Sequence, residues 1–262
     1  MAPRLTVVPD PAAVHAAFAR AIADEIAAGD AESRLTRLIL PVGPTAHYPL
    51  LARICNEERI SWRHVRFTTM DEYLDWTGRS LPEDHPLSFT GFMRRFIDSL
   101  DEPLRPPEGA FVYPNPFDID RVATFIDEIG GIDTCYGGIG VHGHVAFNEP
   151  PLSRFTQVDV DEFLASPTRV VPLAPETIVM NATRSAGGRF ADFPSMAVTI
   201  GMRDILAARR IRLFCDGGTW QQEALDRAVH GPADLRYPVS LLATHPDVEI
   251  VADTVTATKP GL

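Results

Sequence analysis

Residues 35–45, LTRLILPVGPT, form a short apolar run that ends in proline and glycine. This pattern is typical of a strand buried in a parallel sheet and followed by a turn. Similar runs predict strands at 35–42, 64–70, 132–139, 196–200, 211–215, 239–243 and 248–252, and amphipathic segments predict helices at 11–28, 47–57, 89–100, 119–129, 203–208 and 219–229. This alternation predicts an α/β fold over residues 1–262: a single-domain, open, mostly parallel Rossmann-like sheet with helices on both faces.

The composition narrows the classes of partner. The chain has 262 residues, of which 45% are apolar, and a formal net charge of -11. An acidic balance disfavours nucleic acid and anionic membrane surfaces as partners. A small anionic substrate remains compatible with it, because a pocket can be locally positive on an acidic protein.

Cysteine usage and apolar patterning indicate the compartment. Cys55, Cys135 and Cys215 are far apart, which argues against a disulfide framework or a structural zinc site. The N-terminal residues lack the apolar core of a signal peptide. No uncharged apolar stretch approaches the ~20 residues that span a bilayer. We therefore expect a cytoplasmic protein.

Three polar motifs follow predicted strands: PVGPT at 41–45, MDEY at 70–73 and GGIGVHGHVAFNEP at 137–150. Ligands of open parallel sheets bind beyond the carboxyl ends of the strands, so these motifs can build one site. In the last motif, four glycines allow close approach of the backbone to a ligand. His142 and His144 lie two apart, and Glu149 could fix an imidazole tautomer for acid–base chemistry. The alternative is a glycine turn with two satisfied histidines and an exposed glutamate.

The other two motifs carry weaker signals. Asp71 could move a proton between adjacent carbons of an open-chain sugar, but Asp is also a favoured helix N-cap. Gly43 and Thr45 lie in a turn before a predicted helix, where backbone N–H groups can bind an anion. The turn is not a Walker loop, and Pro44 removes one N–H donor.

The order PxGxT, MDEY and GGxGxxGHxAFNEP, followed by TxG at 199–201, resembles the glucosamine-6-phosphate deaminase/isomerase family over nearly the whole chain. The resemblance implies that Asp71 shuttles a proton between C1 and C2, that His144 helps to open the pyranose ring, and that Glu149 supports this histidine. The sugar or sugar phosphate would then lose ammonia and become a ketose without a metal or organic cofactor. The substrate-binding residues expected from the motifs are Gly43, Thr45, Glu72, Gly138, Gly140, Gly143 and Trp220.

The chain departs from the family pattern around the predicted site. His142 stands where the family usually has Asp, and we assign it to the catalytic group. Ile178 and Trp220 replace an arginine and a lysine that bind the phosphate. The loss of one such charge-assisted contact costs about 1.5–3 kcal/mol. A non-phosphorylated substrate is therefore an open alternative, as is replacement of the lost cations by Arg169, Arg184 or Arg203.

Three other functions remain alternatives. A 6-phosphogluconolactonase-like hydrolase would use the same glycine loop and His144 but would not need Asp71. A non-catalytic sugar sensor would fit the lost phosphate ligands. A metal site is not expected, although the HxH run with Asp71 or Glu149 could supply three ligands. The resemblance further implies a homo-oligomer and a lid region around 151–190.

Overall fold

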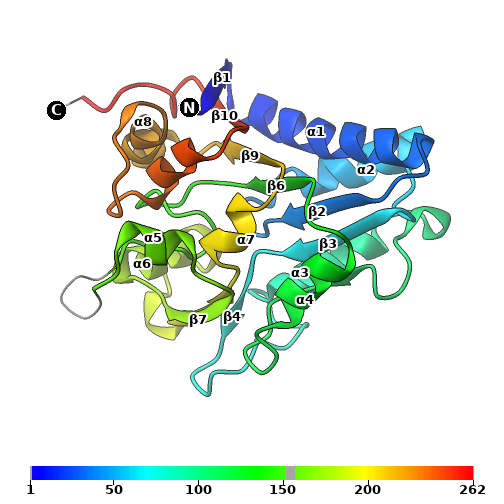
Figure 1. Cartoon of the computed structure of the whole chain (residues 1–262), viewed down its shortest axis with the longest axis horizontal. Helices are drawn as coiled ribbons and strands as arrows, with labels where there is room; N and C mark the ends of the chain where they lie inside the picture. The colour runs from blue at the N-terminus through cyan, green and yellow to red at the C-terminus, as the bar shows by residue number, and fades with distance from the viewer. Residues whose placement is uncertain (1, 152–156, 262) are drawn as a thin grey trace.

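The computed structural model describes residues 2–151 and 157–261. Its main sheet has seven strands, all parallel to their neighbours, and helices cover both faces (Figure 1). In spatial order the strands are β1 (Arg4–Val8), β10 (Val248–Asp253), β9 (Arg210–Cys215), β6 (Thr134–Gly137), β2 (Thr36–Leu40), β3 (Val65–Thr69) and β5 (Phe111–Val112). The predicted α/β class and open parallel sheet are confirmed.

Alternate side chains of the central strands enter two separate hydrophobic cores. Leu38 and Leu40 of β2 pack against one set of helices, and Ile39 packs against the other. Strands covered on both faces are continuously apolar, which explains why the run at 35–42 identifies the sheet. The first face carries α1 (Pro11–Ala31), α2 (Tyr48–Glu58) and α3 (Phe89–Asp98). The second carries α4 (Arg121–Glu128), α5 (Val160–Leu164), α7 (Met202–Leu206) and α8 (Gln222–His230).

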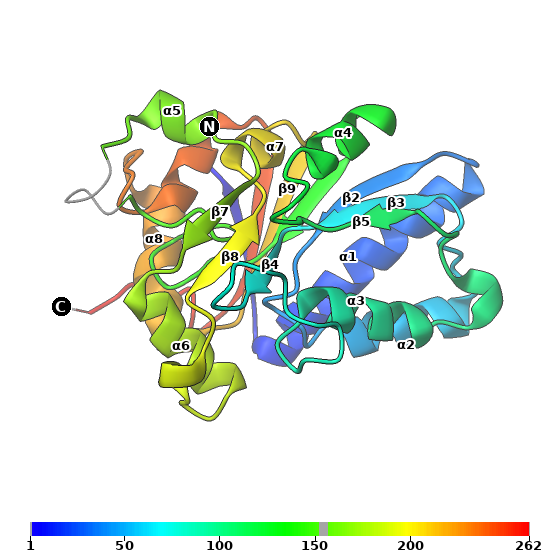
Figure 2. The same cartoon turned by 90° about the horizontal axis from the view of Figure 1, so that it is seen from below.

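A second, three-stranded antiparallel sheet was not predicted. It contains β4 (Asp71–Leu74), β8 (Met196–Thr199) and β7 (Arg169–Pro172), with β8 in the middle. Helix α6 (Pro175–Ser185) lies beside this sheet (Figure 2). Tyr73, Phe147 and Ala182 belong to the apolar cluster that joins them. The small sheet matters for function because its strand β4 begins with Asp71, just beyond the carboxyl end of β3.

The strand predicted at 239–243 is wrong. The segment is a 3₁₀ helix, η4 (Pro238–Thr244), in which Ser240 N–H donates to the Tyr237 carbonyl. Val239, Leu241 and Leu242 are all buried, and a short buried apolar run does not distinguish strand from helix. The strand predicted at 196–200 exists as β8, but it belongs to the antiparallel sheet. The remaining short helices are η1 (Glu102–Leu104), η2 (Phe190–Asp192) and η3 (Gly218–Gln221).

Helix α1 shows how local signals fix an element. Asp10 adopts an extended conformation and its carboxylate accepts a hydrogen bond from Ala13 N–H at 2.8 Å, with Pro11 as the first helical residue. An Asp cap followed by proline is a common start of a helix. Among residues 2–151 and 157–261, no helix is both long and apolar enough to cross a membrane. Of the predicted lid region at 151–190, residues 152–156 lie outside the described part of the chain.

Candidate active site

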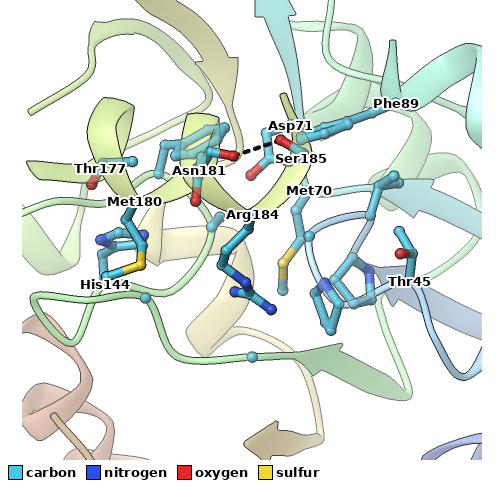
Figure 3. Close-up of a pocket in the computed structure, with 18 of the residues that line it drawn as sticks. Thr45, Met70, Asp71, Phe89, His144, Thr177, Met180, Asn181, Arg184 and Ser185 are labelled. Atoms are coloured by element: carbon cyan, nitrogen blue, oxygen red, sulfur yellow. Dashed lines mark hydrogen bonds between the residues drawn. The ribbon is translucent and has the colours of Figure 1, made fainter. Parts of the chain in front are cut away.

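A cavity of about 380 Å³ lies beyond the carboxyl ends of β2, β6 and β9. Its walls come from residues 41–45 after β2, residues 138–141 after β6, the segment around η3, and one side of α6. In Figure 3, the side chains of His144 and Thr45 lie on opposite sides of the view, with Arg184 between them. The three sequence motifs therefore meet at one cavity, as the parallel sheet predicted.

Asp71 is the first residue of β4 and contributes to the cavity wall. The antiparallel pairing of Asp71 with Thr199 fixes its backbone, so the predicted N-cap alternative does not apply. Asp71 is buried, and only 6% of the residue is exposed. Burial, reinforced by the charge of Glu72, raises the pKa of Asp71 well above the ordinary range. A carboxylate in this state is a stronger base than a solvated one.

Glu72 is placed differently from the prediction. It is not among the residues that line the cavity, and it is fully buried. Its carboxylate accepts hydrogen bonds from the backbone N–H groups of Tyr73, Phe89 and Thr90 and from the Ser88 hydroxyl. Burial raises the pKa of Glu72, and these donors oppose the rise. The geometry gives Glu72 a structural task, which is to hold the first turn of α3 against β4.

The glycine-rich segment after β6 forms a compact turn. Gly140 N–H donates to the His144 carbonyl at 2.8 Å, and Gly143 N–H donates to the Gly140 carbonyl at 2.9 Å. Gly143 has a φ of 75° and accepts from Val239 N–H at 2.7 Å. Gly143 therefore shapes the turn and does not line the cavity, whereas Gly138 and Gly140 do.

His144 lines the cavity and is 8% exposed. A Cβ atom at position 140 would lie 1.8 Å from His144 Nε2, so the imidazole rests directly on the Gly140 backbone. Burial, together with the nearby His142, lowers the pKa of His144 to about 3. The imidazole is neutral near pH 7 and can exchange a proton with a sugar oxygen.

Glu149 and His142 lie close to His144, and neither is among the cavity-lining residues. Glu149 Oε1 is 3.9 Å from His144 Nδ1, which brings the predicted pair together but exceeds hydrogen-bond distance. Glu149 Oε2 accepts from Ala174 N–H at 2.6 Å. Burial raises the pKa of Glu149, although the Thr177 hydroxyl and the Ala174 amide oppose the rise. His142 contacts α6, since its Nε2 is 3.6 Å from Glu176 Oε2.

The cavity is also lined by Gly43, Thr45 and Trp220, whose predicted role in substrate binding stays a prediction. The guanidinium carbon of Arg184 lies 5.2 Å from the centre of the Trp220 ring. Among the described residues that line the cavity, Arg184 is the one Arg or Lys, and no described carboxylate lies within ion-pair distance of it. Ile178 packs in the apolar cluster beneath α6 instead of lining the cavity.

The other two arginines considered from the sequence, Arg169 and Arg203, bind groups outside the cavity. Arg169 donates to Asn148 Oδ1 at 2.9 Å and thereby braces the FNEP segment. Arg203 pairs with Asp204 at 3.0 Å. Only Arg184 of the three candidates reaches the cavity.

Several cavity residues were missed by sequence reasoning, among them Tyr73, Thr177, Asn181 and Asp216. Asn181 Nδ2 donates to the Tyr73 hydroxyl at 3.0 Å, which joins α6 to the small sheet. Thr177, Asn181 and Arg184 lie at spacings of four and three, so helical periodicity could have placed them on one face of α6. Asp216 directly follows β9, where strand-end logic applies equally.

Comparison with known proteins gives the family. No protein-family model matches the chain. A glucosamine-6-phosphate deaminase from Phocaeicola vulgatus is 33% identical over 220 residues, which cover 80% of this chain and 74% of that protein. The chain belongs to the glucosamine-6-phosphate deaminase family. The human protein named glucosamine-6-phosphate deaminase 1 is 32% identical over 221 residues, covering 82% of this chain and 70% of the human one.

Solved structures agree with this assignment. A structure described as a monomeric glucosamine-6-phosphate deaminase has a TM-score of 0.80 and 26% identity, covering 97% of this chain and 98% of its own. A 6-phosphogluconolactonase from Trypanosoma cruzi has a TM-score of 0.68 and 20% identity, covering 98% and 97% of the two chains. The second similarity concerns the fold alone. The predicted family and enzyme class are confirmed, and the lactonase reading remains secondary.

Proposed function

We propose that the protein converts an amino-sugar phosphate, of the glucosamine-6-phosphate class, to a ketose phosphate and ammonia. The observation that carries the proposal is the meeting of Asp71, His144 and Arg184 at one cavity. It supplies a buried base, a neutral imidazole and a cation that pairs with no described carboxylate, in a space of about 380 Å³. That volume lies within the range of small-molecule sites.

The three groups divide the chemistry between them. His144 transfers a proton to or from the ring oxygen and opens the pyranose. Asp71 removes the proton from C2 and returns it to C1, which moves the double bond and leaves an imine at C2. Water then adds to this imine carbon, and the C–N bond breaks to release ammonia and form the ketone. Glu149 Oε1 lies 3.9 Å from His144 Nδ1, and a small approach of the two side chains would let it orient the imidazole.

Arg184 is the group we assign to the phosphate. Its guanidinium is planar, permanently charged and supported by the Trp220 ring, which suits bidentate binding of an oxyanion. Gly43 and Thr45 line the same cavity and add backbone donors. Arg184 thus offers a replacement for the basic residues that the family pattern places at 178 and 220.

A second candidate is the same reaction on a free amino sugar. Asp216 lines the cavity, and its Oδ2 lies 2.6 Å from His15 Nε2. A carboxylate there repels a phosphate dianion. This observation keeps the non-phosphorylated substrate in the experiment below.

Ammonia release from a substrate panel tests the proposal. The panel contains glucosamine-6-phosphate, galactosamine-6-phosphate, the two free amino sugars and 6-phosphogluconolactone, the last followed by acid release. We expect ammonia from a phosphosugar and little from the free sugars. Lactone hydrolysis without ammonia release would replace the proposal with the lactonase, and binding without turnover would favour the sensor.

The pH profile of the reaction should report Asp71. The base must be ionised, and its pKa is raised by burial, so kcat/KM should fall as pH drops through a value above about 4, the ordinary Asp pKa. His144, with a pKa lowered to about 3, stays neutral above that value and adds no acid limb of its own. Initial rates across pH, with circular dichroism at each point, check this. A flat profile down to about pH 4 in a folded protein would contradict the assignment of Asp71 as the base.

Gly140→Ala should damage the site while leaving the fold intact. The added Cβ would sit 1.8 Å from His144 Nε2, so the imidazole must move. A displacement of about 1 Å can cost roughly 100-fold in rate, and we expect kcat to fall by about that factor. Gly261→Ala is the matched control, because nothing lies within 4 Å of its Cβ position. Equal kcat for both variants would show that His144 tolerates displacement.

Three further properties stay predictions. We expect one domain, a cytoplasmic location and a homo-oligomer, and light scattering of the purified chain measures the last. One similar structure is described as that of a monomeric enzyme, and a monomer in solution would contradict the expected homo-oligomer.

A further inference from the structure

A compact group of metal-binding side chains lies behind the cavity wall. His142, His144 and Glu149 each offer one ligand atom, and these atoms lie within 4.8 Å of one another. Two come from the HxH run after β6, and the third follows the turn that Asn148 anchors. Two imidazoles and one carboxylate form a donor set typical of sites for zinc and neighbouring divalent transition metals.

Each of the three residues has a buried polar atom that lacks a hydrogen-bond partner in the described part of the chain. These atoms are His142 Nδ1, His144 Nδ1 and Glu149 Oε1. Thr177 lies near Glu149, but its hydroxyl oxygen likewise makes no well-formed hydrogen bond. Buried polar atoms are almost always satisfied, so three neighbouring residues that each carry an unpartnered atom, with ligand atoms within 4.8 Å of one another, indicate a missing shared partner.

The remaining polar atoms of His142 and Glu149 have neighbours that orient them. Glu149 Oε2 accepts from Ala174 N–H at 2.6 Å, which leaves Oε1 as the free oxygen. His142 Nε2 faces Glu176 Oε2 at 3.6 Å, so the proton of a neutral His142 belongs on Nε2. The lone pair is then on Nδ1, the nitrogen of His142 that has no hydrogen-bond partner. A carboxylate behind a ligating histidine is the usual outer partner of a metal site.

We propose that His142 Nδ1, His144 Nδ1 and Glu149 Oε1 bind a divalent transition metal, with Zn²⁺ as the first choice. Zinc bonds of about 2.0–2.2 Å place neighbouring tetrahedral ligands roughly 3.4 Å apart. The His144 Nδ1–Glu149 Oε1 distance is 3.9 Å, and the three ligand atoms lie within 4.8 Å of one another, so binding needs an inward movement of the side chains of up to about 1.4 Å. The site goes beyond the proposed deamination, which does not require it. Replacement of the family's Asp by His142 supplies the second imidazole.

The bound cation would affect the cavity through His144 alone. With Nδ1 bound to the metal, Nε2 must carry the proton, and Nε2 is the atom that rests on Gly140 at the cavity wall. His144 would then be fixed as a hydrogen-bond donor toward the substrate. The competing explanation is one water molecule held by the same three atoms.

Metal binding can be measured without any activity assay. Protein without a histidine tag is stripped with a chelator, dialysed and titrated with Zn²⁺ against a fluorescent zinc chelator. Titration with Co²⁺ monitors the visible absorption of a four-coordinate ion. We expect one equivalent of Zn²⁺ and a Co²⁺ spectrum of low coordination number. Clearly substoichiometric Zn²⁺ and a six-coordinate Co²⁺ spectrum would overturn the proposal in favour of water.

Variants assign the site to these residues. His142→Asn and Glu149→Gln should weaken Zn²⁺ binding by more than about 10- to 100-fold, which is the range for losing only an outer partner. His230→Asn, an exposed histidine at the end of α8, is the control and should bind as wild type does. Unchanged affinity in folded His142→Asn would also overturn the proposal. Ammonia release is assayed separately with stripped and Zn²⁺-loaded enzyme, so failure of the metal site and failure of the deaminase are distinguishable.

Discussion

Asp71→Asn should lower kcat for ammonia release by roughly 100- to 10,000-fold, the range for loss of a positioned acid–base group. The amide keeps the size and the backbone pairing of Asp71 with Thr199, so the small sheet should remain. It cannot accept the C2 proton. KM should change little, because Asp71 acts on the carbon skeleton and the phosphate is assigned to the other end of the cavity.

Asp127→Asn is the control for this experiment, since Asp127 is exposed on α4 and lies outside the cavity. Rates of ammonia release and thermal melting are measured for both variants. Asp71→Asn should also melt at least as high as wild type, because it removes a carboxylate whose charged form burial disfavours. Retention of more than about a tenth of the wild-type kcat in Asp71→Asn would exclude it as the proton-transfer base.

Arg184→Gln should raise KM for the phosphosugar while kcat stays within a few-fold. Loss of a charge-assisted hydrogen bond costs about 1.5–3 kcal/mol, which corresponds to about 10- to 150-fold in KM. KM for a free amino sugar should be nearly unchanged. The ratio of the two KM values therefore isolates the phosphate contact from any general disturbance of α6.

Arg189→Gln provides a matched control beyond the same helix, because Arg189 is exposed and paired with Asp192 at 3.2 Å. Steady-state kinetics of the three proteins on both sugars decide the matter. An equal rise in KM for phosphorylated and free sugars would show that Arg184 supports the lid and does not bind phosphate. If KM rises for neither sugar, Arg184 does not bind the phosphate, and the result would favour the free amino sugar as substrate, the candidate that Asp216 supports.

The main sheet could be predicted from the sequence because its strands are buried on both faces. Continuous apolar runs such as the one containing Ile39 can be recognised without knowing their neighbours. Strand β1 was not predicted, because three of its five residues are exposed at the sheet edge and the segment has no continuous apolar run. Strands β4 and β7 were not predicted for another reason. Their common partner β8 lies far along the chain, where Thr199 pairs with both residue 71 and residue 169. Such pairing depends on tertiary contacts that no local pattern encodes.

The candidate site likewise has a part that local sequence patterns predicted and a part that depends on tertiary contacts. Asp71, His144 and the glycine turns follow strand ends, so the parallel sheet predicted their convergence. The separate tasks of Asp71 and Glu72 could not be predicted, because two adjacent acids look equivalent until one of them is found on the N-terminus of α3. Arg184 was one of three candidate cations in the sequence. Only the path of α6 distinguishes it from Arg169, which is turned toward Asn148.

Helix α6 links the two ends of the site mechanically. The backbone amide just before its first residue holds Glu149, and its last turn carries Arg184. At 1.5 Å per residue, Ala174 and Arg184 are about 15 Å apart along the helix. We therefore expect that substitutions in the last turn of α6 can change the preferred sugar while the acid–base groups near its first turn stay in place.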